Sequence, residues 1–357
     1  MRRVLASCAV IALTASLLPG LTAAASTAPG GSVSDIRHVG PDYNKGRPLP
    51  LVSSARRVAR RARASFRAAQ AAPPVVGDLR AWLALDDAAG AVYLKNYRLR
   101  GVGDKVEVWV AHETDDVSRN LQFRRGDCRN GERTTITDAQ VDYLIDEFDN
   151  NMFPKESQAF SVPPDRDGAN AQLPGLVDLP PDYYSGEGDN IVVLIDNVRD
   201  SNFYDYNNSK NNTYIAGFFF SLFNELVDRN VMTIDAFDWL HRTGANPPNE
   251  PAPGNVCASR PARPFQYEST FAHEYQHLLE YYEDPDEASW VNEGLSDWAQ
   301  TLVGYVDPSK PITDQDFDSH VQSFLGFYGV LTPANPNPRP SGPETSLNLW
   351  GDQGDDE

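Results

Sequence analysis

The stretch that decides the fold runs from residue 271 to residue 300 and reads FAHEYQHLLEYYEDPDEASWVNEGLSDWAQ. It contains the pattern H-E-x-x-H, made by His273, Glu274 and His277. Residues four apart lie one above the other on the same face of a helix, so the two imidazole rings can offer nitrogens to one ion. Glu274 faces the same cleft without being needed as a ligand.

The first half of this stretch has the pattern of a half-buried helix. Ser269 or Thr270 can cap its start, and Pro285 marks its end. Its apolar side chains recur at helical spacing, at Phe271, Tyr275, Leu278 or Leu279, and Tyr282. The alternative is a surface helix that carries two unrelated histidines.

The second half predicts another helix, with Asn292 as its cap and Glu293 in its first turn. Glu293 comes 16 residues after His277, which leaves room for a turn and an antiparallel return. Its carboxylate would complete a His2Glu site for zinc and leave a fourth position for water. Asp297 lies one helical turn after Glu293, where it can accept a hydrogen bond from a ligating histidine.

H-E-x-x-H followed by N-E-G-L-S-D resembles the gluzincin metallopeptidases, and HEYQHLLEYYED with WVNEGLSDWA is most similar to their secreted hyicolysin-like branch. The resemblance covers residues 271–300, with YIAGFFF upstream as a looser match. It implies an α+β fold in which a mixed β-sheet is followed by zincin active-site helices. It also implies that zinc is held by His273, His277 and Glu293, that Glu274 is the general base, and that Asp297 orients a histidine.

The metzincin pattern is excluded by two residues. Metzincins require a glycine three residues after the second histidine and a third histidine three residues later. This chain has Glu280 and Glu283 at those positions. Glu280 remains an alternative third ligand, but it would have to reach the ion from the helix that already carries both histidines.

The expected function is therefore that of a secreted zinc-dependent endopeptidase acting on proteins or peptides. Zinc would polarise the substrate carbonyl and activate a water molecule, while Glu274 takes the proton of that water and delivers it to the leaving nitrogen. An oxyanion donor is also expected, and the candidates are His320, Tyr305 and Tyr328. The alternative is a zinc-containing extracellular binding or surface module without turnover, because only 64 residues follow Glu293.

The N-terminus reads as a secretory signal over residues 1–25. Arg2 and Arg3 precede a mostly apolar run, and Ala23-Ala24-Ala25 offers a small-residue cleavage site. No later run is apolar and long enough to span a bilayer. The sequence thus predicts a secreted, extracellular protein without a transmembrane segment.

Residues 26–75 form a basic, Arg/Ala-rich leader, which we interpret as a pro-segment or linker. Residues 1–75 hold 11 basic and 2 acidic side chains, which leaves 20 basic and 48 acidic side chains for the rest of the chain. A disordered leader that could fold onto an acidic body explains this asymmetry, and a solvated stalk is the alternative. Nucleic acid is not expected as a partner, because the body would repel phosphate.

The catalytic domain is predicted over residues 76–331, with N-terminal strands within 76–125 and the motif region at 269–305. Alternating or continuous apolar runs predict strands at 92–99, 105–111, 190–198, 214–220 and 231–237, and helical spacing predicts helices at 137–148 and 221–228. Residues 332–357 are proline-rich and then acidic, and we interpret them as a tail, either of a compact chain or of a truncated one.

Two further features are predicted outside the motif. Once the signal is removed, Cys128 and Cys257 remain and can form one disulfide in an oxidising compartment, the alternative being two separate buried thiols. Acidic side chains in loops could collect Ca²⁺, or they are simply solvated: Asp165 with Asp167, and Asp196 with Asp200 and Asp205.

Overall fold

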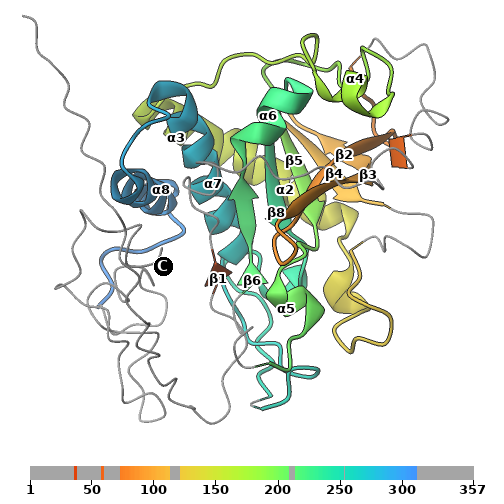
Figure 1. Ribbon diagram of the computed structural model, residues 1–357. Helices are drawn as coiled ribbons and strands as arrows, with labels where there is room; N and C mark the ends of the chain where they lie inside the picture. The colour runs from red at the N-terminus through yellow and green to blue at the C-terminus, as the bar shows by residue number, and fades with distance from the viewer. Residues whose placement is uncertain are drawn as a thin grey trace, which may run out of the picture.

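A six-stranded mixed sheet lies at the centre of the protein and is flanked by helices (Figure 1). The computed structural model describes residues 36–37, 58–59, 73–112, 121–208, 214–252 and 254–311. The strand order across the sheet is β2-β3-β4-β5-β8-β7. The strands are β2 (Leu79–Asp86), β3 (Ala91–Val102), β4 (Val106–Ala111), β5 (Ile191–Asp196), β8 (Asn230–Asp235) and β7 (Gly217–Phe219).

The sheet combines antiparallel and parallel strand pairing. Strands β2, β3 and β4 are antiparallel neighbours, and the predicted hairpin of β3 and β4 is confirmed. Strands β4, β5 and β8 run parallel, and β7 returns antiparallel to β8. Every residue of β5 and of β8 is buried, as expected of parallel strands covered on both faces. The α+β class is thus confirmed.

The helix after the hairpin begins as predicted. Helix α2 (Asp138–Glu147) has Thr137 as its N-cap, and the Thr137 and Gln140 side chains cap each other's backbone N–H groups. The helical path then continues through a π-helical turn, η3 (Phe148–Met152), into α3 (Phe153–Ala159). The predicted helix at 221–228 is also present, as α6 (Ser221–Val227).

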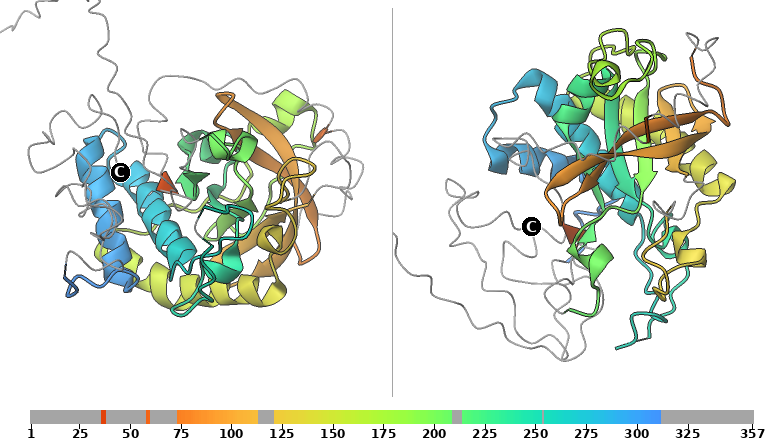
Figure 2. Two further views of the ribbon diagram at one scale, coloured as in Figure 1. Left: turned by 90° about the horizontal axis from the view of Figure 1, so that it is seen from below. Right: turned by 45° about the vertical axis from the view of Figure 1, so that its right-hand side comes forward.

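Two long helices follow the sheet and carry the H-E-x-x-H stretch. Helix α7 (Gln266–Glu283) packs on β7 and β8, and α8 (Ser289–Val303) packs on α7. Figures 1 and 2 show α8 on the outer side of α7, away from the sheet. The Phe148 ring of η3 stacks on Phe271 of α7 with ring centroids 4.7 Å apart, so α7 packs against the α2–α3 path as well as against the sheet.

Both helices begin earlier than the sequence predicts. Helix α7 starts at Gln266, so Ser269 and Thr270 are not its caps; the N-cap is Phe265, whose side chain makes no capping hydrogen bond. The early start is held by Tyr267, which is fully buried and donates its hydroxyl to the Phe237 carbonyl at 2.5 Å. Tertiary packing therefore overrides the local capping signal here.

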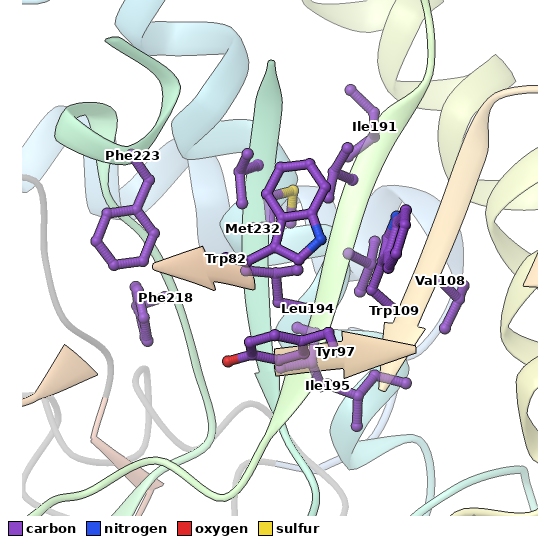
Figure 3. Close-up of a cluster of buried hydrophobic side chains, with 14 of the residues drawn as sticks. Trp82, Tyr97, Val108, Trp109, Ile191, Leu194, Ile195, Phe218, Phe223 and Met232 are labelled. Atoms are coloured by element: carbon purple, nitrogen blue, oxygen red, sulfur yellow. The ribbon is translucent and has the colours of Figure 1, made fainter. Parts of the chain in front are cut away.

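Large side chains from several strands pack together in the hydrophobic core. Trp82, Leu194 and Met232 come from β2, β5 and β8 and lie together (Figure 3). The Trp82 ring lies 5.4 Å from Trp109 and 5.0 Å from Tyr184, measured between centroids. Burial on this scale fixes the sheet as a rigid base for the helices.

The two edges of the sheet differ in how they are covered. At the β2 edge, the Tyr183 hydroxyl accepts from Ala81 N at 2.7 Å, and the Tyr184 hydroxyl donates to the Ala81 carbonyl at 2.7 Å. Those bonds occupy main-chain groups that an edge strand leaves open. The opposite edge is β7, which lies against α7 and the H-E-x-x-H motif.

Some predicted segments lie outside the described residues. These are the signal at 1–25, most of the leader at 26–75, and everything after residue 311, including the tail at 332–357. Within the part of the chain that the structure describes, no helix combines the length and apolarity needed to cross a membrane.

Candidate metal centre

Helices α7 and α8 bring three potential ligand atoms together. Nε2 of His277 lies 3.0 Å from Nε2 of His273. Oε2 of Glu293 lies 3.2 Å from Nε2 of His273 and 3.5 Å from Nε2 of His277. This trio is the one group of its kind found among the described residues.

The triangle has the size that a tetrahedral ion requires. Zinc binds imidazole nitrogen and carboxylate oxygen at about 2.0–2.1 Å, and a tetrahedron of that radius places its ligands about 3.3 Å apart. The measured edges of 3.0, 3.2 and 3.5 Å bracket that value. The second oxygen of Glu293, Oε1, is buried without a hydrogen-bond partner. The donor set therefore fits a zinc ion.

The opposite nitrogen of each imidazole faces an acceptor. Nδ1 of His273 lies 3.2 Å from Oδ1 of Asp297, and Nδ1 of His277 lies 2.5 Å from Oδ1 of Asn292. An acceptor at Nδ1 holds the proton there and leaves the Nε2 lone pair directed at the centre of the triangle. The structure therefore places Asp297 where the sequence predicts it.

Asn292 is the residue that sequence reasoning misread. It was expected to cap α8, but the helix begins at Ser289 after the N-cap Ala288, and Asn292 lies within the first turn. Its side chain is buried and turned toward His277. The sequence carries no signal for this role, because asparagine suits a cap equally well and only the packing of α8 on α7 turns it toward His277.

Further polar side chains hold the two helices together behind the histidines. Ser296 lies 2.9 Å from Nδ1 of His277 through its Oγ and donates to Gln276. On the His273 side, Nε2 of Gln300 lies 3.2 Å from Nδ1 and 3.1 Å from Asp297, and Ser269 donates to Gln300. Neither Ser296 nor Gln300 was predicted, since serine and glutamine are equally common on exposed helix faces.

The two histidines and the carboxylates beside them shift one another's pKa values. Burial alone lowers the pKa of His273, but Asp297 and Glu293 raise it well above its ordinary value. Burial likewise opposes the charged form of His277, and Glu293 raises its pKa. In turn, the two histidines outweigh burial and hold the pKa of Glu293 well below its usual range. A metal ion that binds here has to displace protons, so its affinity falls at low pH.

Glu274 is tied to the edge of the sheet. Its Oε2 accepts a hydrogen bond from the backbone N–H of Phe219, the last residue of β7, at 2.9 Å. Glu274, His273 and His277 are all buried, with at most 2 % of each residue exposed. The expected base is therefore held beside the candidate ligands, of which the Glu293 side chain is the more exposed, at 17 %.

Of the three predicted oxyanion donors, the structure describes only Tyr305, whose hydroxyl is engaged away from the candidate centre. The Tyr305 hydroxyl donates to Glu147 at 2.6 Å and lies 3.3 Å from Asn151 Nδ2, so it points to the α2–η3 path. His320 and Tyr328 lie outside the described residues. Glu280, the alternative third ligand, accepts from Gln276 Nε2 at 3.1 Å and does not join the triangle.

The acidic residues considered for Ca²⁺ have structural partners. Asp196 is the last residue of β5 and lies in the strand rather than in a loop; Lys95 donates to it at 2.5 Å and Tyr97 at 2.9 Å. Both oxygens of Asp200 accept backbone N–H groups, those of Phe203 and Ile215. In the described part of the chain, neither these carboxylates nor Asp165, Asp167 and Asp205 form a group that could hold a metal ion.

The two remaining cysteines are joined. Cys128 and Cys257 form a disulfide with their Cα atoms 5.4 Å apart and 129 residues apart in sequence. The bond links the loop before α2 to the loop before α7. The predicted disulfide is thus present.

Comparisons with known proteins do not identify a family for this chain. No protein-family model and no curated protein matches the chain. The case for a function rests on the site itself.

Proposed function

We propose that this chain is a secreted zinc-dependent endopeptidase of the gluzincin type. The observation that carries the proposal is the triangle of His273 Nε2, His277 Nε2 and Glu293 Oε2, whose edges of 3.0, 3.2 and 3.5 Å fit a tetrahedral zinc site. The sheet is followed by a helix with H-E-x-x-H and then by a helix with N-E-x-x-x-D. This order agrees with the resemblance to that family. The apolar N-terminus and the disulfide agree with export.

The residues around the triangle have distinct roles in the proposed reaction. Zinc bound there would polarise the scissile carbonyl and acidify the attacking water. Glu274 would accept the proton of that water and pass it to the leaving nitrogen, as a buried carboxylate beside the ion can. Asp297 and Asn292 would keep both imidazole rings aimed at the centre.

One observation favours the alternative, an extracellular zinc module without turnover. Glu274 is fully buried and already accepts from Phe219 N at 2.9 Å, so it is engaged before any substrate arrives. In such a module, Glu274 would brace β7 against α7, and its replacement would change stability but no reaction rate.

Two measurements distinguish the two candidates: the amount of protein-bound zinc and the rate of casein hydrolysis. Both are made on the secreted protein and on its Glu274→Gln variant. The peptidase predicts about one zinc per chain in both proteins, with hydrolysis lost at least about 100-fold in Glu274→Gln. Glu280→Gln is the matched control, since it removes a glutamate of the same helix and should leave both readouts unchanged. Zinc without hydrolysis in the parent protein would favour the module, and absence of zinc would reject both.

A further inference from the structure

We propose that the protein holds a small monovalent anion, of the chloride class, in its core against the guanidinium of Arg80. Arg80 lies on β2, the edge strand at the opposite side of the sheet from β7 and the candidate metal centre. The anion would balance a buried positive charge that no side chain neutralises. Neither zinc nor turnover is involved, so the site can be tested independently of the proposed function.

Arg80 is buried without a partner. It is 2 % exposed, and among the residues that the structure describes, neither Nη1 nor Nη2 has a hydrogen-bond acceptor. None of the ion pairs between described residues includes Arg80. Asp78 acts on it only weakly, and its Oδ2 accepts from Val75 N at 3.0 Å. A guanidinium stays protonated in proteins, so burial cannot remove this charge.

The neighbouring charges do not cancel. Burial lowers the pKa of Arg80, Glu107 of β4 opposes this shift, and Arg229, the residue before β8, adds to it. Both oxygens of Glu107 are engaged, since Oε1 accepts from Arg229 at 2.7 Å and Oε2 accepts from Trp109 Nε1 at 3.0 Å. Glu107 and Arg229 thus neutralise each other, and the charge of Arg80 is left over. Such a charge is costly in a dry interior unless a counter-ion accompanies it.

The strand register brings these side chains onto one face of the sheet. Arg80 pairs with Tyr97 of β3, and Trp109 of β4 pairs with Leu99 of β3. Tyr97 and Leu99 are two residues apart, so they and their cross-strand partners share a face. The guanidinium carbon of Arg80 lies 5.6 Å from the centre of the Trp109 ring. Arg80 therefore extends from the edge strand over β3 toward β4.

Other donors on this face also lack acceptors. Trp82 follows Arg80 by two residues, and its ring lies beside Trp109 (Figure 3). Its Nε1 has no acceptor within the described residues, and neither has Nε of Arg229. Unpaired donors require an acceptor, and the uncompensated charge favours an anion over water. Because Trp82, Trp109 and Tyr184 pack closely here, we assign a monatomic ion rather than a polyatomic one.

The first test measures how stability depends on chloride. Urea denaturation of the whole protein is followed in mixtures of sodium chloride and sodium gluconate at constant ionic strength. If the folded protein binds one chloride that the unfolded chain releases, the equilibrium constant for unfolding should fall about tenfold for each tenfold rise in chloride above the Kd. Stability that does not change with chloride would overturn the proposal.

The second test removes the guanidinium. Arg80→Met should still fold, because an apolar side chain of similar length can replace a buried charge without loss of stability. Its unfolding constant should vary by less than about twofold over the same chloride range. Arg100→Met is the matched control, since Arg100 is partly exposed and its Nε donates to Asp138 at 3.0 Å; this variant should keep the parental dependence. Equal chloride dependence in the parent and in Arg80→Met would contradict the assignment.

A third variant should act in the opposite direction. Glu107→Gln removes the carboxylate that neutralises Arg229 and repels an anion, so two guanidinium groups then share the ion. The Kd for chloride should fall at least about tenfold. An unchanged or higher Kd would place any bound chloride away from this cluster.

The position of the ion can be seen directly. In crystals of the parent grown with bromide in place of chloride, an anomalous difference peak is expected beside Nη1 and Nη2 of Arg80. The peak should be missing from crystals of Arg80→Met and present in those of Arg100→Met. An ordered water at this place without anomalous signal, or bromide at surface sites only, would overturn the proposal.

Discussion

Asn292 of α8 and His277 of α7 are joined by a contact of 2.5 Å between Oδ1 and Nδ1. This contact holds the proton on the outer nitrogen of His277 and aims the inner nitrogen at the candidate metal centre. It also links the orientation of a candidate ligand to the packing of α7 and α8, which the segment 284–288 connects in sequence.

Replacement of this acceptor should weaken zinc binding without removing a ligand. For Asn292→Ala we expect a 10- to 100-fold rise in the zinc Kd, about the range seen when such partners of ligating histidines are removed. Competition with a chromogenic chelator measures it. Asn150→Ala is the control, because Asn150 is exposed and its side chain donates to Asp146 at 2.8 Å. Equal affinities in both variants would show that Asn292 does not orient the ligand.

Substitution of two glutamates tests which carboxylate is the third ligand of the proposed zinc site. Glu293→Gln keeps the size of the side chain but removes the charge that closes the triangle, so bound zinc should drop from about one per chain to well below half. Glu280→Gln should keep its zinc, because Glu280 bonds to Gln276 outside the triangle. Metal analysis after dialysis distinguishes them. Loss of zinc in Glu280→Gln with retention in Glu293→Gln would reverse the assignment.

The contact between β7 and α7 depends on a glycine. A Cβ at Gly217 would lie 2.6 Å from Cγ2 of Thr270 and 3.1 Å from Cδ1 of Ile234. Gly217→Ala should therefore lower the free energy of unfolding by about 1–3 kcal/mol, measured by urea denaturation. Adding Thr270→Ser removes the closest atom and should restore part of the loss. Gly175→Ala, with no atom within 4 Å, is the control for the substitution itself.

The disulfide should be a major source of stability. A bond that closes a loop of 129 residues lowers the entropy of the unfolded chain, which corresponds to about 5 kcal/mol in the chain-entropy model. We expect the Cys128→Ser, Cys257→Ser double variant to lose about 3–5 kcal/mol in urea denaturation. A reductant should destabilise the parent by a similar amount and leave the double variant unchanged. A variant as stable as the oxidised parent would contradict this.

The sequence predicts the ligand trio better than the start of its helices. Spacing pairs His273 with His277 and Glu293 with Asp297, because residues four apart share one face of a helix. The meeting of the two pairs depends on the packing of α8 on α7, which the family resemblance implies and spacing alone does not. The start of α7 does not follow, because Gln266 and Tyr267 are helical only through contacts with Tyr214 and the Phe237 carbonyl, which are distant in sequence. The predicted cap at Asn292 is wrong, since asparagine suits a cap and a partner of histidine equally, and only the neighbouring helix decides between them.

Contacts between residues that are distant in sequence are not predicted either. The sequence does not predict strand β2, because its run LRAWLALD does not alternate and its burial depends on β3 and on Tyr183 and Tyr184. The hydrogen bond from Phe219 N to Glu274 was likewise invisible, since it joins positions 55 residues apart. Local patterns identify elements, whereas contacts between elements require the fold.

Acid should stabilise the protein through a buried carboxyl on β8. Burial raises the pKa of Asp235 to about 7, although the N–H groups of Val198 and Phe237 oppose this shift. Because the folded pKa exceeds the ordinary value of 3.8, the folded protein keeps a proton that the unfolded chain releases between those pH values. The free energy of unfolding should therefore fall as pH rises from about 4 to 7, by up to about 4 kcal/mol from this group. Burial also raises the pKa of Asp200 to about 6, which adds in the same direction.

The pH slope, rather than the stability at one pH, is the quantity to measure. Asp235→Asn loses an acceptor for backbone N–H groups at every pH, so its stability should be lower throughout. Its free energy of unfolding should nevertheless fall less steeply between pH 4.5 and 7.5 than that of the parent, because no carboxyl at 235 remains to ionise. Urea denaturation at several pH values gives both curves. Parallel curves would show that Asp235 is ionised in the folded protein across this range and that its pKa is not raised.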